Sequence, residues 1–379
     1  IPARERGRRM KVLHVNINYL GTALHQTMIQ ALDRQGVESR IFAPTSDRTK
    51  AVIQPRPNVT VAECFSKLDR WNYFLKQNKI LNALLSEIDP RGFDCVHAYT
   101  LFSDGNVALR LKQKYGLPYV VAVRDTDVNA FFKYRPHLRP LGVRILRQAA
   151  AVCFLSPAYQ ERVLNHFVPE ACREEIRAKA QIIPNGIDAF YLNHPPEGPR
   201  ALPGRTLKVI TVGKITPRKN ILATAQALDL LRAKGMEIEH IVVGAVEDTR
   251  MAQRLKNHPH TRCLPAQGKE ELLKLYRGSD LFVLNSTKET FGLVYAEALS
   301  QGLPVVYTRG QGFDGQFQEG EVGHSADARN LQDIARAVEL TLGEYERIQP
   351  RCVGSARKFN WADITRDYAS LYEAVCKNQ

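Results

Sequence analysis

The sequence lacks most of the features that mark secreted, membrane-spanning or ATP-hydrolysing proteins. Its seven cysteines are scattered without a Cys-x-x-Cys pair, which argues against a disulfide framework or a zinc site and favours the reducing cytosol. No apolar run reaches 18 residues, so a membrane-spanning helix is not expected. A Gly-Lys-Ser or Gly-Lys-Thr loop is also missing, which removes the main support for a P-loop ATPase.

Acidic residues are in short supply, with 39 Asp and Glu against 53 Lys and Arg and a formal net charge of +14. Such an excess favours acidic partners, among them nucleotides, anionic lipid headgroups, acidic polymers and nucleic acid. The cations are dispersed and accompany no RNA-binding or helix-turn-helix signature, so we expect no nucleic-acid partner. The arginine-rich residues 1–9 precede Met10, which we expect to be the true start, and are left out of the fold prediction.

A chain of 379 residues predicts roughly two domains. Short β-branched runs alternate with helical patterns throughout, which predicts an α/β fold of stacked βαβ units with parallel sheets. The runs in the first half are Val12–Ile17, Ser39–Ala43, Cys95–Ala98, Tyr119–Val123, Val152–Leu155 and Ile182–Ile183. Those in the second half are Val209–Val212, His240–Val243, Asp280–Leu284 and Pro304–Tyr307.

A proline-rich stretch divides the two sets of predicted strands and predicts a hinge. We expect an N-terminal Rossmann-like domain over residues 10–188, a linker over 189–203 and a second Rossmann-like domain over 204–358. A final helix over 361–376, with apolar positions spaced for one buried face, is expected to complete the first domain. Two open parallel sheets joined in this way would face a central cleft at the carboxyl ends of their strands, where such folds bind ligands.

Two glutamates, Glu289 and Glu297, bracket a glycine turn and the start of an apolar helix. Ionised carboxylates only accept hydrogen bonds, and a sugar or a ribose offers pairs of hydroxyl donors. The helix N-terminus between them favours an anion. The segment can therefore hold a sugar, a phosphate and a ribose in sequence, although the spacing alone also fits a loop acid followed by a solvated helix acid.

Cations and glycines follow two other predicted strands. Lys214 and Lys219 lie between a strand end and a helix start, where ammonium groups can reach a diphosphate. Gly21 lies between the first strand and the first helix and could bring backbone N–H groups near a phosphate, although a plain turn is the simpler interpretation.

Four segments resemble, in order and spacing, glycosyltransferase family 4, the retaining nucleotide-sugar transferases of the GT-B fold. They are Pro184–Asp188, Val212–Lys219, Glu289–Glu297 and Gly302–Val306. The resemblance extends from Met10 to about Tyr372. It implies a retaining transferase that moves a hexose-type sugar from a nucleotide diphosphate sugar, such as a UDP- or GDP-sugar, to a hydroxyl acceptor.

The resemblance also implies roles for individual residues. Glu289 would contact the donor sugar and Glu297 the ribose, while Lys214 and Lys219 would contact the diphosphate. The residues between the glutamates would meet the sugar and diphosphate through backbone groups; these are Thr290, Phe291, Gly292, Leu293 and Val294. Cations that stabilise the departing diphosphate then supply much of the catalysis. Asp127 is the expected supporting group near the anomeric centre, so Asp127, Lys219 and Glu289 form the predicted catalytic set.

The sequence departs from the family pattern at three places. Lys214 stands where the family has an arginine. Arg124-Asp125-Thr126-Asp127 replaces a His-Gly-x-Asp turn, so Arg124 is expected to meet a phosphate or an acidic acceptor. Gly310–Gln316 replaces a Gly-Gly-x-x-Glu turn. The Asp125 and Asp127 pair imitates the metal-binding Asp-x-Asp of the other main glycosyltransferase fold, but with lysines available for the diphosphate we expect metal independence and no cofactor.

The acceptor is expected on the first domain, which carries two segments rich in aromatic and basic residues. Their members include Leu68, Trp71, Phe74 and Leu75 with Lys67, Arg70, Lys76 and Lys79, and then Phe131–Arg139. Such a face either covers a core or rests on anionic headgroups, which would place a lipid-linked or glycan acceptor for cell-surface polysaccharide or glycolipid assembly. The expected location is cytoplasmic, with peripheral contact at the inner membrane face. A nucleotide-sugar-binding protein without transfer activity and a phosphorylase of the same architecture remain as alternatives.

Overall fold

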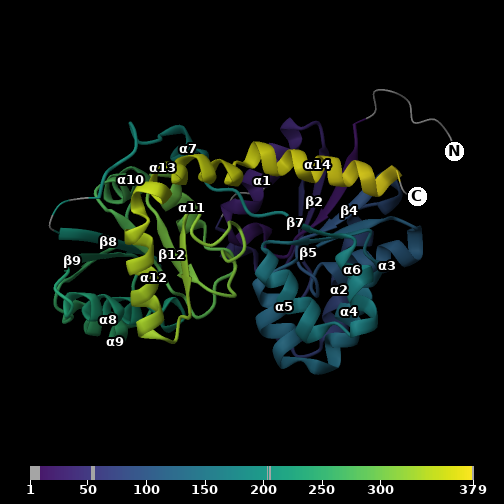
Figure 1. Ribbon diagram of the computed structural model, residues 1–379. Helices are drawn as coiled ribbons and strands as arrows, with labels where there is room; N and C mark the ends of the chain where they lie inside the picture. The colour runs from purple at the N-terminus through teal and green to yellow at the C-terminus, as the bar shows by residue number, and fades with distance from the viewer. Residues whose placement is uncertain (1–8, 53–55, 203, 205, 378–379) are drawn as a thin grey trace. The chain divides into compact units, whose positions relative to one another are not determined.

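The computed structural model describes residues 9–52, 56–202, 204 and 206–377, so residues 1–8 of the predicted leader lie outside it (Figure 1). The chain divides into two compact units, each built around one parallel sheet. Unit 1 takes in the described residues of Ile1–Leu155, Gln160–Ile183 and Trp361–Gln379. Unit 2 takes in those of Ser156–Tyr159 and Pro184–Asn360.

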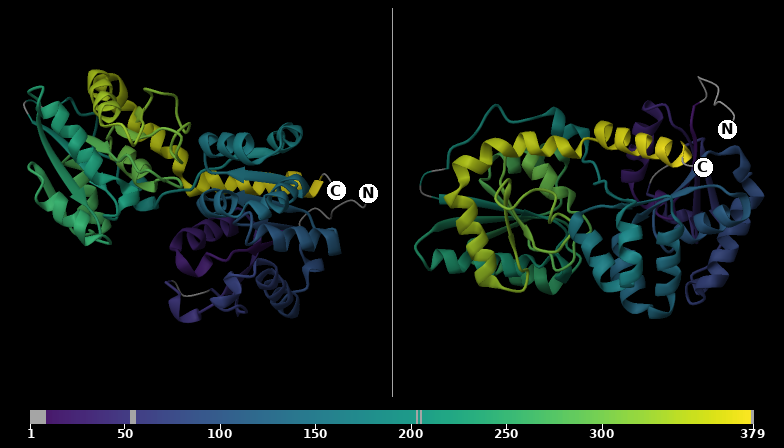
Figure 2. Two further views of the ribbon diagram at one scale, coloured as in Figure 1. Left: turned by 90° about the horizontal axis from the view of Figure 1, so that it is seen from below. Right: turned by 45° about the vertical axis from the view of Figure 1, so that its right-hand side comes forward.

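Unit 1 contains a seven-stranded sheet in the order β3-β2-β1-β4-β5-β6-β7. Its strands are β1 Lys11–Val15, β2 Glu38–Thr45, β3 Val59–Glu63, β4 Cys95–Ala98, β5 Tyr119–Val123, β6 Ala151–Phe154 and β7 Ala180–Ile182. The central strands are fully buried because helices cover both faces of the sheet, which is why β5 reads as a continuous apolar run (Figure 2). The chain order reverses beside β1, which pairs with β2 on one side and with β4 on the other.

Parallel strands need crossover connections, and helices supply most of them in unit 1. The α-helices are α1 Ala23–Arg34, α2 Tyr73–Glu87, α3 Gly105–Tyr115, α4 Arg139–Gln148, α5 Pro157–Phe167, α6 Glu170–Arg177 and α14 Trp361–Lys377. Shorter helical turns are η1 Tyr19–Gly21, η2 Arg48–Lys50, η3 Leu68–Arg70, η4 Pro90–Gly92, η5 Asp127–Phe132 and η6 Pro136–Leu138. Thr22 and Asn72 cap α1 and α2, each accepting a backbone N–H with its side-chain oxygen.

Unit 2 contains a six-stranded sheet in the order β10-β9-β8-β11-β12-β13. Its strands are β8 Thr206–Val212, β9 Glu237–Val243, β10 Thr261–Leu264, β11 Leu281–Val283, β12 Val305–Thr308 and β13 Gly323–Ala326. Its helices are α7 Ala189–Asn193, η7 Pro217–Lys219, α8 Ile221–Arg232, α9 Thr249–Lys256, α10 Lys269–Arg277, α11 Leu293–Ser300, α12 Leu331–Gly343, α13 Tyr345–Ala356 and η8 Arg357–Phe359. Here the order reverses between β8 and β11.

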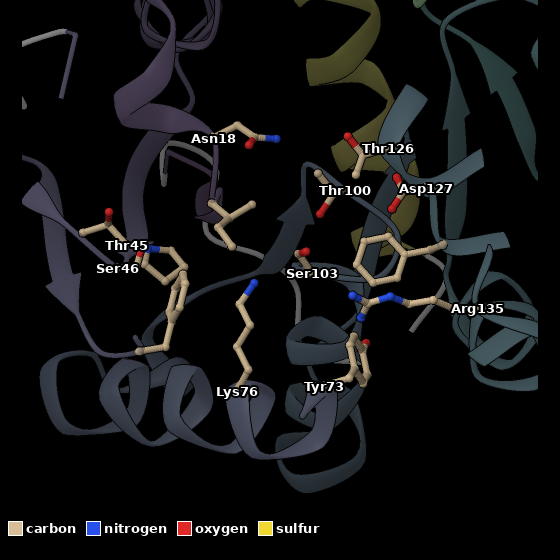
Figure 3. A pocket seen from close by; sticks show the side chains of 14 residues that line it. Asn18, Thr45, Ser46, Tyr73, Lys76, Thr100, Ser103, Thr126, Asp127 and Arg135 are labelled. Carbon is tan, nitrogen blue, oxygen red and sulfur yellow. The ribbon is translucent and has the colours of Figure 1, made fainter. Parts of the chain in front are cut away.

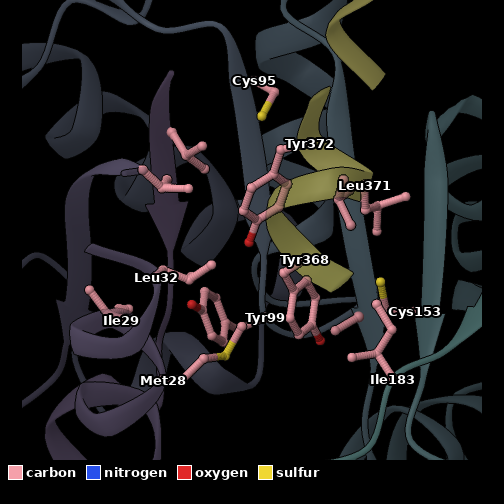
Figure 4. Close-up of a cluster of buried hydrophobic side chains, with 14 of the residues drawn as sticks. Met28, Ile29, Leu32, Cys95, Tyr99, Cys153, Ile183, Tyr368, Leu371 and Tyr372 are labelled. Atoms are coloured by element: carbon pink, nitrogen blue, oxygen red, sulfur yellow. The ribbon is translucent and has the colours of Figure 1, made fainter. Parts of the chain in front are cut away.

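The helix α14 completes the core of unit 1, although it follows unit 2 in the chain. It packs on α1, β4 and β5, and the hydroxyl of Tyr372 lies 2.6 Å from Nδ1 of His97. Tyr368, Leu371 and Tyr372 are buried in one hydrophobic cluster of unit 1 (Figure 4). Each such side chain contributes roughly 1.5–3 kcal/mol by leaving water, so α14 is a large part of the stability of unit 1.

The segment predicted as a linker, residues 189–203, belongs to unit 2 as far as it is described. It contains α7, and Arg277 donates to the carbonyl oxygens of His194 and Pro195. Arg200 donates to the carbonyl oxygens of Ser279 and Gln301. These contacts satisfy backbone carbonyls that an extended linker would leave to water, so the described residues of this segment pack as part of unit 2.

The predicted strands agree with the structure to within a few residues at their ends, but three strands were missed: β3, β10 and β13. All three lie at sheet edges, where one side of the strand has no neighbour in its sheet. β13 reads Gly-His-Ser-Ala and contains no β-branched residue, so its strand conformation depends on pairing with β12. Local propensity carries no signal for a strand of this kind.

Candidate active site

A buried ion pair lies at the reversal point of the unit 2 sheet. β8 and β11 are neighbours there, so the segments that follow them leave the sheet side by side. Lys219 follows β8 and Glu289 follows β11, and Nζ of Lys219 donates to Oε2 of Glu289 at 2.6 Å. The two side chains are 12% and 7% exposed. The structure therefore brings together two of the three predicted catalytic residues.

The backbone around Lys219 is fixed by its neighbours in sequence. The hydroxyl of Thr216 accepts the N–H of Lys219 and caps the short helix η7. Asn220 then adopts a left-handed conformation with φ of 55°, which asparagine tolerates better than most residues. Its amide donates to the carbonyl oxygens of Asn285 and Ala328, so the turn is anchored to the loop after β11 as well.

Glu289 is held by the loop that follows β12, the next strand in the sheet. Its N–H donates to Oε1 of Gln311 at 2.9 Å, and its carbonyl oxygen accepts the N–H of Gly312 at 3.0 Å. The hydroxyl of Tyr159 donates to the same carbonyl at 3.0 Å, and the hydroxyl of Ser286 donates to Oε2. Both the backbone and the carboxylate of Glu289 are thus positioned before any ligand is bound.

Gly312 allows the two loops to meet backbone to backbone. A Cβ at this position would lie 2.0 Å from the carbonyl oxygen of Thr290, closer than any side chain tolerates. Gly310, Gly312 and Gly315 also have the spacing of a dinucleotide-binding fingerprint. However, the segment continues as turns and no helix begins there, so it supports the Glu289 loop and does not form a Rossmann phosphate loop.

The predicted donor-binding residues Thr290, Phe291, Gly292, Leu293 and Val294 form the entry into α11. Gly292 has φ of 80° and precedes the first helical residue. A Cβ there would meet the ring of Tyr295 at 2.4 Å, so both the conformation and the space require glycine. The first N–H groups of a helix have no partner within it, and they give this end of α11 a positive potential suited to a phosphate.

Glu297 lies in the second turn of α11, beside α10. The hydroxyl of Tyr276 donates to its Oε2 at 3.2 Å. Burial raises the pKa of Glu297 to about 7, with a further contribution from the negative charge of Asp188. Asp188 is itself paired with Lys269. A carboxyl with a pKa near neutrality, partly open to solvent, can accept a pair of hydroxyl donors once it is ionised.

Lys214 is placed differently from Lys219. It is 64% exposed, and its ammonium group lies 2.5 Å from Oε1 of Glu247. The predicted diphosphate contact of Lys214 thus requires the side chain to leave Glu247. A solvated pair of this kind is worth little, so the rearrangement costs little.

Asp127 of unit 1 is fully buried beneath the ends of β4 and β5. Its carboxylate accepts the N–H groups of Leu101, Phe102 and Arg124 at 2.9–3.1 Å. Burial raises the pKa of Asp127 to about 6, against the lowering effect of these bonds and of the Arg124 charge. The carboxylate therefore joins two loops.

Arg124 and Gly21, the other predicted site residues of unit 1, are placed by separate contacts. Nε of Arg124 donates to the carbonyl oxygen of Tyr99 at 3.2 Å. Gly21 is exposed at the end of η1, and a Cβ there would meet nothing within 4 Å, so its surroundings do not demand glycine.

Family models match both units. One described as "Glycosyl transferases group 1" matches residues 198–358, and one described as "Glycosyltransferase Family 4" matches residues 25–189. The chain is a glycosyltransferase of the family 4 type. The region matched by the first model contains Lys219, Glu289 and Glu297. The region matched by the second contains Arg124 and Asp127.

Relatives of this glycosyltransferase carry the name D-inositol 3-phosphate glycosyltransferase. The protein of Actinosynnema mirum is 26% identical over 382 residues, which cover 90% of this chain and 89% of the relative. That of Corynebacterium glutamicum is 31% identical over 191 residues, 47% of this chain and 46% of its own length. The similarity to the first of these runs through both units.

Solved structures give the fold. Sucrose-phosphate synthase from Thermosynechococcus elongatus superposes with a TM-score of 0.73 at 18% identity, covering 98% of this chain and 100% of the other. Anabaena HepE in complex with UDP-glucose gives 0.65 at 16% identity, covering 96% and 100%. This glycosyltransferase has the GT-B fold.

No group of three or more His, Cys, Asp or Glu side chains that could hold a metal ion occurs among the residues the structure describes. The Asp125 and Asp127 pair does not converge on one point, because Asp127 binds backbone N–H groups and Oδ1 of Asp125 accepts the side-chain amide of Asn129. Metal independence stays a prediction. In the same described part of the chain, no helix has the length and apolar character needed to cross a membrane.

Sequence reasoning missed a pocket of about 420 Å³ in unit 1 (Figure 3). Lys76 and Arg135 line it, whereas the sequence placed both in surface segments. A usable signal existed, because small hydroxyl residues lie at or shortly after the ends of two strands of unit 1: Thr45 is the last residue of β2, Ser46 follows it, and Thr126 lies in the loop after β5. Residues at carboxyl ends of parallel strands gather at one edge of the sheet.

Proposed function

We propose that this glycosyltransferase transfers a hexose-type sugar from a nucleotide diphosphate sugar to a hydroxyl acceptor with retention of anomeric configuration. The observation that carries the proposal is the buried Lys219–Glu289 pair at the β8/β11 reversal point. A desolvated cation and carboxylate side by side offer what a donor of this class needs: positive charge for its diphosphate and an acceptor for its sugar hydroxyls.

The donor occupies unit 2 in this proposal. Glu289 accepts hydroxyls of the sugar, and Glu297 accepts the two ribose hydroxyls. The diphosphate lies against Lys219 and the N-terminal N–H groups of α11, and Lys214 turns from Glu247 to join them. Anabaena HepE was solved with UDP-glucose, which supports a UDP-sugar among the candidate donors.

Catalysis rests on stabilising the leaving diphosphate. As the anomeric C–O bond breaks, negative charge grows on the diphosphate, and fixed positive groups stabilise it without reorganising. The acceptor hydroxyl attacks from the face that the diphosphate leaves, and a diphosphate oxygen takes its proton, so no protein nucleophile is required. Asp127 supports this arrangement by positioning the loops after β4 and β5.

A donor panel tests the proposal directly. UDP-, GDP- and ADP-sugars are screened by thermal shift, where a ligand at 100 times its Kd adds about 2.7 kcal/mol to stability. Release of the nucleotide diphosphate is then followed, and the anomeric configuration of the product is read by NMR. A panel in which no nucleotide sugar binds, or a product with inverted configuration, would contradict the proposal.

Two alternatives are separated by the same assays. A nucleotide-sugar-binding protein without transfer activity would bind a donor but release no sugar from it, even slowly to water. A phosphorylase would need inorganic phosphate for turnover and would form a sugar phosphate. The proposed transferase instead releases nucleotide diphosphate with or without added phosphate.

The exposed apolar residues at the start of α2 support peripheral contact with an anionic membrane from the cytoplasmic side. Trp71 is 90% exposed and Phe74 is 59% exposed, with Leu68 and Leu75 beside them. Lys67 and Lys79 are exposed in the same stretch of chain, with the ammonium group of Lys79 paired with Asp69 at 2.8 Å, and the side chain of Arg70 lies outside the described residues. Rings that enter the interface beside cations that meet headgroups fit a transferase of polysaccharide or glycolipid assembly.

A further inference from the structure

The short helix η8 lies at the end of unit 2, and its last residue is Phe359. The side chain of Phe359 is 0% exposed, although Trp361 already belongs to unit 1. Boundaries between compact units usually fall in exposed stretches of chain that make few contacts. A fully buried aromatic ring at this point therefore needs an explanation, and its neighbours supply one.

The ring of Phe359 packs against two loops of the donor site. Its centroid lies 5.5 Å from that of Phe291, which belongs to the Glu289 loop after β11. It lies 6.2 Å from the ring centroid of Phe313 and 5.8 Å from that of Phe317, both in the loop after β12. The pairs with Phe291 and Phe317 are edge to face, a favoured arrangement of aromatic rings. The position of η8 thus constrains both loops.

Lys358, the residue before Phe359 in η8, holds the loop after β12 at a second point. Its Nζ donates to the carbonyl oxygen of Gln316 at 2.6 Å. The same loop supplies Gln311 and Gly312, whose hydrogen bonds fix the backbone of Glu289. The helix η8 therefore acts on Glu289 through a loop that it contacts with both a ring and a cation.

The backbone of Phe359 contacts the other end of the donor site. Its carbonyl oxygen accepts the N–H of Ile187 at 2.9 Å, and Ile187 directly precedes Asp188. Burial, and after it the negative charge of Asp188, raises the pKa of Glu297. Phe359 thus contacts the Glu289 loop with its ring and the segment beside Glu297 with its carbonyl oxygen.

A different hydrophobic cluster packs α8 and α12 on the sheet of unit 2. Its buried members include Leu231 and Val338, and Phe359 is not one of them. The ring contacts of Phe359 are with loop residues, so its burial orders loops and does not join a helix to the sheet. This arrangement favours a role for Phe359 in the site over a role in the main core.

We propose that Phe359 is a positioning residue of the donor site and that Lys358 assists it. Phe359 holds the Glu289 loop and the segment beside Glu297 at a fixed separation, so that the two glutamates keep the spacing that one nucleotide sugar spans. The effect on donor binding rests on the proposed function, whereas the ordering of the two loops does not. Each part is tested by its own measurement.

Amide hydrogen exchange of the full chain, without any donor, tests the ordering of the loops. Phe359→Leu removes the ring contacts and keeps an apolar side chain in place. Under conditions where exchange proceeds by local opening, we expect the amides of Glu289 and Gly312 to exchange about tenfold or more faster than in the wild type, because three ring contacts are lost. Wild-type exchange rates at these two amides would overturn the proposal.

Leu231→Ala is the matched control for Phe359→Leu. It truncates a fully buried side chain in the last turn of α8, and Lys219 precedes the other end of that helix. It should destabilise unit 2 as a whole but change local exchange at Glu289 and Gly312 by less than about twofold. Equal increases in the two variants would show that Phe359 is only part of the core, and the proposal would be wrong.

Lys358→Met tests the contact with Gln316 without changing the core. The loss of one hydrogen bond should speed exchange in the loop after β12 about fivefold. Arg357→Met removes the same charge one residue earlier, from an exposed side chain, and should change this exchange by less than about twofold. Equal effects of the two variants would reveal a general charge effect and contradict the role of Lys358.

Kinetics with the nucleotide sugar that the donor panel selects connect the loops to the reaction. In Phe359→Leu the KM for the donor should rise about tenfold, because a smaller fraction of the free protein is ready to bind. The kcat should fall less than about threefold, because a bound donor restores the order of the loops. An unchanged KM, or a loss confined to kcat, would refute the positioning role.

Reciprocal linkage gives the last test. If loop order favours donor binding, donor binding must favour loop order, so a saturating nucleotide sugar should slow exchange of the Ile187 amide about threefold or more in the wild type. Slower exchange at Glu289 alone would mean that Phe359 does not connect the two ends of the site. If the wild type binds no nucleotide sugar, the proposed function fails, and the exchange of the ligand-free variants still decides whether Phe359 orders the loops.

Discussion

Nζ of Lys219 and Oε2 of Glu289 lie 2.6 Å apart, almost wholly removed from solvent. Taking both charges out of water is costly, and a buried pair of this kind often adds little to net stability. Its position at a reversal point of the sheet, where open α/β folds bind ligands, is better explained by a ligand that uses each partner. A nucleotide sugar would separate their roles by bringing a diphosphate to the lysine and hydroxyls to the glutamate.

Lys219→Met is expected to lower turnover of the donor roughly 10²- to 10³-fold, because it removes a fixed charge at the leaving group. It should also lower the free energy of unfolding by roughly 3 kcal/mol, because Glu289 is left buried without its cation. Steady-state kinetics and denaturant titration measure the two effects.

The matched control for that variant is Lys234→Met. Lys234 is also 2.6 Å from a glutamate, Glu339, but it is 59% exposed. Its loss should cost less than about 1 kcal/mol and leave turnover unchanged. Similar losses of stability and activity in the two variants would contradict the role given to Lys219.

Glu297 predicts a pH dependence of donor binding. Burial raises the pKa of its folded-state carboxyl to about 7 from an ordinary 4.5, and ribose hydroxyls favour the ionised form. Affinity for a nucleotide sugar should therefore increase as the pH rises towards about 7 and level off above it, with roughly a tenfold change between pH 5.5 and 8. The diphosphate of a nucleotide sugar carries no group that titrates in this range, so the profile reports on the protein.

The raised pKa of Glu297 has the opposite effect on stability: a rise in pH that strengthens donor binding weakens the fold. The folded state holds the proton of Glu297 more tightly than the unfolded state, so this contribution is present at low pH and is lost as the pH rises through about 7. Glu297→Gln mimics the protonated form and should bind donor weakly at every pH. Its stability relative to wild type should rise by roughly 1–2 kcal/mol between pH 5 and 8. A variant with the wild-type binding profile would exclude Glu297 from the site.

Gly312→Ala tests the support of the Glu289 loop. The added Cβ would collide with the carbonyl oxygen of Thr290, so the two loops must separate. We expect donor affinity to fall about tenfold or more and the unfolding free energy to fall by roughly 2 kcal/mol. Gly354→Ala, within α13 and with open space at its Cβ, should instead stabilise the chain by about 0.5–1 kcal/mol. Unchanged affinity in Gly312→Ala would mean that the loop contact does not position the donor.

Trp71→Ser combined with Phe74→Ser tests membrane contact. Both side chains are exposed, so stability should change by less than about 0.5 kcal/mol, while co-sedimentation with anionic vesicles should drop several-fold. Leu340→Ser removes an exposed apolar side chain of unit 2 and should not affect vesicle binding. If the wild-type chain stays in the supernatant when anionic vesicles are sedimented at low salt, the membrane proposal is wrong.

The sequence predicted the parts of the site that depend on order along the chain. Lys219 and Glu289 follow apolar strands, and consecutive βαβ units bring such positions to one edge of a sheet. The sequence did not predict that the two side chains pair, because the pairing depends on how the loops after β8 and β11 fold. The sequence also did not predict that Gln311 and Gly312 hold Glu289. That contact depends on how the loop after β12 folds back on the loop after β11. Lys76 and Arg135 were assigned to a surface because helical spacing alone does not show which face of α2 borders a pocket.

The position of α14 in unit 1 has a consequence for biosynthesis. A ribosome releases the strands β1 to β7 long before it releases Trp361–Lys377, yet Tyr368, Leu371 and Tyr372 fill the core beside them. Unit 2 is continuous from Pro184 to Asn360 apart from the short segment Ser156–Tyr159 at the start of α5, so it can finish folding first. Throughout translation of unit 2, the nascent unit 1 would expose an apolar groove that only the last helix closes. This groove is where we expect a chaperone to bind the growing chain, and where a helix grafted after residue 183 would be needed to produce unit 1 alone.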